Sequence, residues 1–173
     1  MNILILNGSP RPNGNTAAMI QAFKEGAKAH HITVVNVCQK KIAGCLACEY
    51  CHTKGNGTCI QKDDMQEVYT LLKEADMLVL ASPIYYHGIS GQLKCAIDRF
   101  YAAAYPKKPP QLSKIAMFLS SGDPDMYDGA VFSYQGDFLD YLGLQGMGIF
   151  TSCGSQNQSS EKLEELRNFG ASL

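Results

Sequence analysis

Short apolar runs alternate with amphipathic stretches along the whole chain. Near-continuous apolar runs at 3–6, 77–81 and 115–119 predict parallel strands that are covered on both faces. The run at 32–37 is more mixed and suits an edge strand, and a glycine-containing run at 146–152 predicts a fifth strand. Strands are therefore expected at intervals from one end of the chain to the other.

Helical periodicity occupies the segments between these runs. Asp63 followed by Gln66 resembles a capping box, and Ser90 is in position to cap a third helix. Five helices are expected, at 15–29, from Asp63 to about Ala75, from Ser90 through Tyr101, at 129–143 and at 160–169. The first three should bury these side chains: Met19, Ile20, Phe23 and Ala27; Met65, Val68 and Leu72; Leu93, Ile97, Phe100 and Tyr101.

This alternation predicts the fold class. Five strand–helix units with right-handed crossovers give an α/β fold, in which a doubly wound, five-stranded parallel sheet lies between two helical layers. No repeat, low-complexity stretch or linker interrupts the pattern, so we expect a single domain over residues 1–173. The Pro-rich stretch Tyr105–Pro110 is interpreted as a stiff surface connection.

Composition and charge exclude several classes of protein. The 173 residues are 46% hydrophobic and 18% charged, and a net charge of −1 without a basic stripe argues against nucleic acid as a partner. No apolar run approaches the ~20 residues that cross a bilayer, and the N-terminus lacks the features of a signal peptide. Seven cysteines, four of them in one short segment, favour free thiols or cofactor ligands over a disulfide framework. We expect a cytoplasmic protein that does not bind membranes.

A polar, glycine-bearing loop at 8–16 follows the first predicted strand and opens the first predicted helix. Loop N–H groups and the unpaired first N–H groups of that helix point at one spot, which is the geometry of a phosphate site. Side-chain donors are also available from Ser9, Arg11, Asn13, Asn15 and Thr16. The alternative is an ordinary polar turn in which Asn15 caps the helix.

The residues of this loop indicate which kind of phosphate-containing ligand it can bind. The loop lacks the Gly-Lys-Ser/Thr ending of a P-loop. Gly8 and Gly14 do not have the G-x-G-x-x-G spacing, and the second strand ends in Cys38-Gln39-Lys40 rather than in an acid that holds a ribose. Hydroxyl and amide groups with one arginine suit a terminal monophosphate.

Two later loops, 82–90 and 120–128, should reach the same edge of the sheet, because ligands of open parallel sheets bind beyond the carboxyl ends of the strands. The proline, glycine and aromatic residues of these loops suit a flat ring. His87 is interpreted as structural or exposed rather than as a proton donor, since no carboxylate is placed to orient it.

The clustered cysteines have the spacing C-x2-C-x2-C-x7-C, formed by Cys45, Cys48, Cys51 and Cys59. Four thiolates can hold a [4Fe-4S] cluster or a zinc ion, and the same residues can also remain free or form disulfides. The remaining cysteines are interpreted as small core or interface residues: Cys38, Cys95 and Cys153.

Several motifs occur in order over residues 1–100: Gly8-Ser9-Pro10-Arg11 with Gly14-Asn15-Thr16, the four cysteines with Asp63-Asp64-Met65, Ser82-Pro83-Ile84-Tyr85, Leu93-Lys94 and Asp98-Arg99. On these motifs the chain resembles the NADPH-dependent FMN reductase group of the flavodoxin-like fold, near the iron–sulfur flavoproteins and their cluster-free relatives. The resemblance implies strand order 2-1-3-4-5, bound FMN and assembly into homodimers or homotetramers. Residues 46–60 and 101–110 are candidates for the subunit contact.

The resemblance also implies roles for particular residues. The FMN phosphate would be held by Ser9, Arg11, Asn13, Asn15 and Thr16. The isoalloxazine ring would be lined by Pro83, Ile84, Tyr85 and Tyr86, with Ser121 and Gly122 on its other side. No residue is assigned a catalytic role, because the flavin carries the redox chemistry. The four clustered cysteines are the implied ligands if a [4Fe-4S] cluster is present.

Three functions are compatible with these motifs. The first is an oxidoreductase that passes electrons from NAD(P)H through bound FMN to a quinone, a flavin or another small acceptor. The second is an iron–sulfur flavoprotein relay fed by a ferredoxin-type donor. The third is a flavin-binding regulator without turnover. A simple flavodoxin carrier fits less well, since a near-neutral chain lacks the acidic field that steers such carriers to basic partners.

Overall fold

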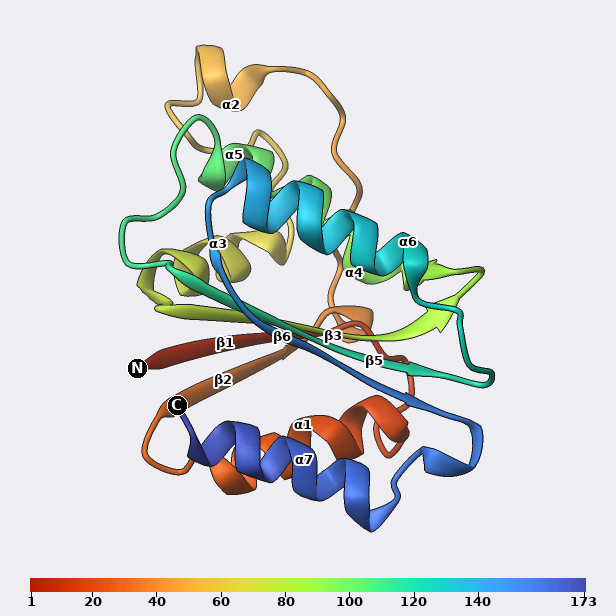
Figure 1. Cartoon of the computed structure of the whole chain (residues 1–173). Helices are drawn as coiled ribbons and strands as arrows, with labels where there is room; N and C mark the ends of the chain where they lie inside the picture. Colours follow the sequence, from red (N-terminus) through yellow and green to blue (C-terminus); the bar gives the residue numbers. More distant parts are fainter.

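A parallel sheet of five strands runs through the middle of the computed structural model, which describes residues Met1–Leu173 (Figure 1). The strands are β1 (Asn2–Asn7), β2 (His31–Asn36), β3 (Met77–Tyr85), β5 (Lys114–Ser121) and β6 (Gln145–Cys153). Their order is β2-β1-β3-β5-β6, and the two-residue β4 (Gly88–Ile89) pairs antiparallel with the end of β3. The predicted fold class, the five strands and their flavodoxin-like order are confirmed.

Helices cover both faces of the sheet (Figure 1). One layer consists of α1 (Asn15–Gly26) and α7 (Ser160–Ala171). The other consists of α3 (Met65–Glu74), α4 (Gly91–Asp98), α5 (Tyr101–Ala104) and α6 (Asp128–Ser133), which continues into the π-helix η2 (Tyr134–Tyr141). The short α2 (Tyr50–Thr53) lies outside α5, and single 3-10 turns occur at η1 (Val37–Gln39) and η3 (Gly154–Gln156).

The central strands are buried on both faces because alternate side chains enter different layers. Along β1, Leu4 and Leu6 pack in the core under α3 and α4, whereas Ile3 and Ile5 pack in the core under α1 and α7. The side chains predicted to face inward on the first two helices are all buried there. The near-continuous apolar runs are thus explained by burial on two sides.

Three local predictions were wrong at the helix ends. The first helix ends at Gly26 rather than near residue 29. Asp63 is not the N-cap of α3, which is Asp64; its carboxylate accepts a hydrogen bond from the Met65 N–H at 3.3 Å and also binds Arg99. The third helix ends at Asp98, and Tyr101, expected on its inner face, lies on the separate helix α5 and is 36% exposed. Ser90 does cap α4, since its hydroxyl accepts a hydrogen bond from the Leu93 N–H.

Replacing Gly26 by alanine should lower the free energy of unfolding by about 1–3 kcal/mol, as expected for overpacking. A Cβ at Gly26 would lie 1.9 Å from the backbone oxygen of Arg167, so α1 and α7 would have to move apart. Gly136 is the matched control, because nothing lies within 4 Å of its added Cβ. Urea unfolding should show no loss of stability for Gly136→Ala; equal losses in both variants would refute the close-approach argument.

Candidate functional site

A cavity of about 340 Å³ opens at the carboxyl edge of the sheet. It lies where the loops after β1, β3, β5 and β6 meet, since these strand ends are neighbours in the sheet. Its lining is mostly polar and consists of Ser9, Arg11, Gly14, Asn15, Thr16, Pro83, Ile84, Tyr85, Ser120, Ser121, Gly122, Gly154 and Asn157. A volume in this range is typical of a small-molecule or cofactor site.

The loop after β1 is held in shape by its own hydrogen bonds. The Ser9 N–H donates to the Asn7 side chain at 3.0 Å, and the Arg11 N–H donates to the Ser9 hydroxyl at 3.3 Å. The α1 N-cap is Gly14, which provides no side-chain cap, so the expected alternative of an Asn15 cap is wrong. The first N–H groups of α1 therefore remain available to an anion at the cavity.

The loop after β3 forms the second wall. Tyr86 and His87 have φ values of 50° and 62°, which turn the chain back so that Tyr85 pairs with Gly88. Pro83, Ile84 and Tyr85 thereby line the cavity. The Tyr86 side chain is fully exposed, as is expected when successive residues of a strand end point to opposite sides.

The loops after β5 and β6 form the third wall and are tied together. The Tyr127 hydroxyl lies 2.7 Å from the Ser121 hydroxyl and donates to the Ser152 oxygen at 3.0 Å. The Asn157 side chain donates to the Ser121 oxygen at 2.8 Å. Burial raises the pKa of Tyr127, so this phenol remains protonated and continues to donate. The wall is thus fixed before any ligand binds.

Nine of the eleven residues predicted to bind the cofactor surround this one cavity: Ser9, Arg11, Asn15, Thr16, Pro83, Ile84, Tyr85, Ser121 and Gly122. Asn13 instead lines a separate polar groove with Lys24 and Asn36, and Tyr86 points into solvent. Four lining residues were not among those predicted to bind the cofactor: Gly14, Ser120, Gly154 and Asn157. Gly154 and Asn157 follow the fifth strand. They could have been predicted, because ligands of open parallel sheets bind beyond the carboxyl ends of the strands.

His87 is exposed at the tip of the β3–β4 turn, in agreement with its interpretation as an exposed residue. Cys38, Cys95 and Cys153 are half-buried, which fits small packing residues.

The four clustered cysteines line a second, much smaller cavity of about 20 Å³, together with Tyr69 and Arg99. Cys45 and Cys48 are exposed, whereas Cys51 and Cys59 are buried. Burial raises the pKa of the Cys51 thiol. The thiols have the chemistry for a cluster, but no three side chains meet in an arrangement that could hold a metal ion. The cavity has room for about one water molecule, so a cluster does not fit this arrangement.

Stability should fall as pH rises from 10 to about 12, in part because of Tyr69. Burial raises the pKa of Tyr69 from 10.0 to about 12. Its contribution to stability is complete below the unfolded pKa and is lost as pH rises through the folded pKa. Urea unfolding of Tyr69→Phe should show a smaller alkaline loss than the parent protein, and the remainder should come from other groups whose pKa burial raises, among them Tyr127, Tyr134 and Cys51. An identical alkaline loss in both proteins would exclude Tyr69 as a cause.

No helix in the structure is long and apolar enough to cross a membrane. An iron–sulfur flavoprotein from Archaeoglobus fulgidus is 36% identical over 128 residues, which are 70% of this chain and 56% of that protein. One from Methanocaldococcus jannaschii is 37% identical over 127 residues, or 70% of this chain and 62% of that protein. The chain therefore aligns with little more than half the length of these curated relatives.

Solved structures share the fold at lower identity. An NAD(P)H:quinone oxidoreductase from Methanothermobacter marburgensis superposes with a TM-score of 0.72 at 18% identity, covering 99% of this chain and 94% of that one. An azoreductase from Bacillus anthracis gives 0.67 at 18% identity, covering 99% and 95%. Residues 1–171 match the family described as NADPH-dependent FMN reductase. The chain belongs to this FMN-binding family.

Proposed function

We propose that the protein is an FMN-dependent oxidoreductase that takes electrons from NAD(P)H and delivers them to a quinone, a flavin or another small acceptor. The observation that carries this proposal is the single cavity at the sheet edge. There, a loop suited to a phosphate lies opposite two walls suited to a flat ring.

Residues around the cavity would divide the binding of FMN between them. Ser9, Asn15 and Thr16, with the Arg11 guanidinium and the first N–H groups of α1, would hold the phosphate. The Pro83–Tyr85 wall and the Ser121–Gly122 wall would lie on the two sides of the ring. When bound, FMN would supply the redox chemistry, so the residues of the chain orient it and form its electrostatic surroundings. Asn13 and Tyr86 lie outside this set as the structure places them.

The proposal is tested by purifying the protein, recording its visible spectrum and titrating it with FMN while following quenching of flavin fluorescence. Consumption of NADH and NADPH is then measured with a quinone as acceptor. Flavin binding together with turnover supports the oxidoreductase. Tight flavin binding without turnover from any donor would instead identify a regulator, and failure to bind FMN would reject the assignment.

A second candidate is an iron–sulfur relay fed by a ferredoxin-type donor. It is favoured by one observation, that all four clustered cysteines line one cavity. The loop that carries them would have to rearrange, since the thiols do not converge as they lie. The test is to measure iron and sulfide after anaerobic purification. Their presence would support the relay, and their absence would indicate that the four cysteines are free thiols. Free thiols of this kind persist in a reducing cytoplasm, where we place the protein.

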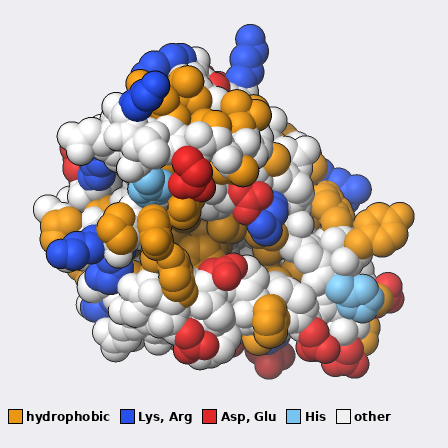
Figure 2. Space-filling model, turned by 90° about the horizontal axis from the view of Figure 1, so that it is seen from above, with side chains coloured by type: hydrophobic (Ala, Val, Ile, Leu, Met, Phe, Trp, Pro, Cys, Tyr) orange, Lys and Arg blue, Asp and Glu red, His pale blue; other side chains and the backbone are white.

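We also propose that a second copy of the chain covers the face of α2, α4, α5 and α6. Figure 2 shows hydrophobic side chains around a hollow on this face. The exposed large hydrophobic residues are Leu46, Ile60, Tyr85, Tyr86, Tyr101, Tyr105, Val131, Phe132 and Tyr141, and none belongs to α1 or α7. Protruding aromatic rings beside a hollow on one face permit a self-complementary contact.

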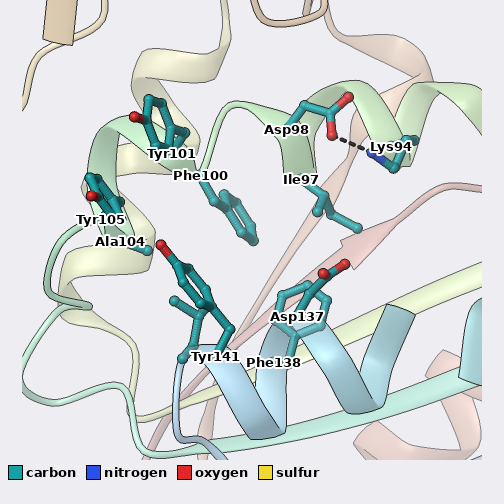
Figure 3. A pocket seen from close by; sticks show the side chains of 11 residues that line it. Lys94, Ile97, Asp98, Phe100, Tyr101, Ala104, Tyr105, Asp137, Phe138 and Tyr141 are labelled. Carbon is teal, nitrogen blue, oxygen red and sulfur yellow. Dashed lines mark hydrogen bonds and ion pairs between the residues drawn. The ribbon is translucent and has the colours of Figure 1, made fainter. Parts of the chain in front are cut away.

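The hollow is a groove of about 250 Å³ between α4, α5 and η2 (Figure 3). The rings of Tyr105 and Tyr141 lie within 6° of parallel at its rim, 6.4 Å apart. Size-exclusion chromatography with light scattering should give the molar mass of a dimer or tetramer. In Tyr141→Ser the measured mass should shift toward that of a monomer. A monomer in the parent protein would reject this contact.

A further inference from the structure

Arg99 is the largest fully buried side chain of the protein, with 1% of its surface exposed. It follows directly after α4, whose other end begins at Ser90, beside Gly8 of the phosphate loop. A buried arginine is rare unless it is paired. None of its hydrogen bonds reaches the cavity proposed for FMN, so its role lies elsewhere.

Two partners of Arg99, Ala43 and Asp63, flank the two ends of the segment that carries the four cysteines, here called the cysteine loop (residues 44–62). The guanidinium donates to both carboxylate oxygens of Asp63, at 2.9 and 3.1 Å. It also donates to the backbone oxygen of Ala43 at 3.0 Å. The Ala43 N–H in turn donates to Asp63 at 3.1 Å. Residues 43 and 63 are thereby held at one point.

Further hydrogen bonds close the base of the loop beside this point. The Lys41 N–H donates to the Asp64 side chain at 2.7 Å, and the Asp64 N–H donates back to the Lys41 oxygen at 3.2 Å. The Gln61 side chain donates to the Gly44 oxygen at 3.1 Å. The cysteine loop is therefore closed at its base, and its outer part contacts α5, where the His52 ring lies 2.9 Å from the Tyr101 oxygen and the Tyr101 hydroxyl donates to Glu49 at 3.2 Å.

Arg99 also forms part of the wall of the cavity that the four thiols line. Its Nε donates to the Tyr69 hydroxyl at 3.3 Å, and Tyr69 lines the same cavity. Burial would lower the pKa of Arg99, but its hydrogen bonds to Asp63 and Tyr69 raise it overall. A permanent positive charge therefore lies at the cavity that holds the buried thiols.

We propose that Arg99 is the positioning residue of the cysteine loop. By holding both ends of the loop, it keeps Cys51 and Cys59 inside while Cys45 and Cys48 remain exposed. The quartet is thus divided into an inner, protected pair and an outer, reactive pair. This inference concerns the cysteine site of the second candidate function, and it does not depend on FMN binding.

The test uses two variants of the ion pair in the whole protein. Asp63→Asn keeps the shape of the side chain and removes its charge, and Arg99→Lys keeps the charge and loses the two-pronged geometry. Native protein is treated anaerobically with iodoacetamide, and alkylation of each cysteine is followed by peptide mass spectrometry. In Asp63→Asn, Cys51 and Cys59 should react about tenfold faster, because the base of the loop opens locally. Cys45 and Cys48 should react at the parent rate.

Two further variants, Arg99→Lys and a control, distinguish a positioning role of Arg99 from a general loss of stability. Arg99→Lys should protect Cys51 and Cys59 to an intermediate degree. Glu67→Gln removes the exposed pair with Lys40 and should change no rate. Unchanged protection in Asp63→Asn overturns the proposal, and so does faster alkylation of Cys38 and Cys95 by the same factor. Failure of FMN to bind would reject the proposed oxidoreductase but would leave this labelling pattern unaltered.

Discussion

Replacing Arg99 by methionine should lower the free energy of unfolding by about 3–5 kcal/mol, the usual cost of removing one partner of a buried ion pair. Methionine retains much of the apolar part of the arginine side chain. The loss of stability therefore comes from removing the positive charge and its hydrogen bonds. Asp63, whose side chain is only 17% exposed, would be left with a carboxylate that has lost its cation. Urea unfolding at neutral pH measures the change, with the exposed Lys94–Asp98 pair as control. Lys94→Ala should cost less than about 1 kcal/mol.

The effect of Arg99→Met should also depend on pH. Burial would raise the pKa of Asp63, but hydrogen bonds from Arg99 and from the Ala43 N–H lower it below 3.8 overall. Stability from this carboxylate is therefore present above the unfolded pKa and is lost as pH falls through the folded pKa. The difference between the parent and the variant should shrink in acid. A difference that stays constant, or is below about 1 kcal/mol at neutral pH, would show that the pair does not organise this region.

Replacing Arg11 by alanine should weaken FMN binding by about 1–3 kcal/mol, which is roughly 5–150-fold in Kd. Arg11 is the one arginine that lines the cavity, and a guanidinium forms charge-assisted hydrogen bonds with a phosphate dianion. Loss of binding should come without loss of stability, because the Arg11 side chain is exposed. Fluorescence titration gives the Kd, and thermal unfolding gives the stability.

Lys24→Ala is the matched control for Arg11→Ala. Lys24 lies in the last turn of α1 and also carries a positive charge, but it lines the neighbouring groove rather than the cavity. Its removal should leave the Kd for FMN almost unchanged. If both variants weaken binding equally, the arginine acts only through net charge. If Arg11→Ala binds as tightly as the parent, the phosphate lies elsewhere.

The three central strands could be predicted from the sequence because they are buried on two sides and their apolar runs are short and dense. The turn of Tyr86 and His87 could not be predicted, since neither residue carries the glycine or asparagine signal of a left-handed turn. The break between α4 and α5 was hidden because apolar positions continue with helical spacing through it.

Other features of the structure could not be predicted because they depend on contacts between distant residues or on the backbone of a turn. Asp63 has the local sequence of a helix cap, but a partner 36 positions away binds its carboxylate more strongly. Arg99 was visible in the sequence only as part of a motif, because nothing local reveals that it is buried. Asn13 and Tyr86 were assigned to the site by the family resemblance, whereas the direction of each side chain depends on the backbone of the turn.

A crystal structure of the protein soaked with FMN would show directly whether the cavity at the sheet edge holds this cofactor. We expect the phosphate within the loop at 8–16 and the ring between the Pro83–Tyr85 and Ser121–Gly122 walls. A flavin bound in the groove between α4, α5 and η2, or a cavity left empty at saturating FMN, would contradict the assignment.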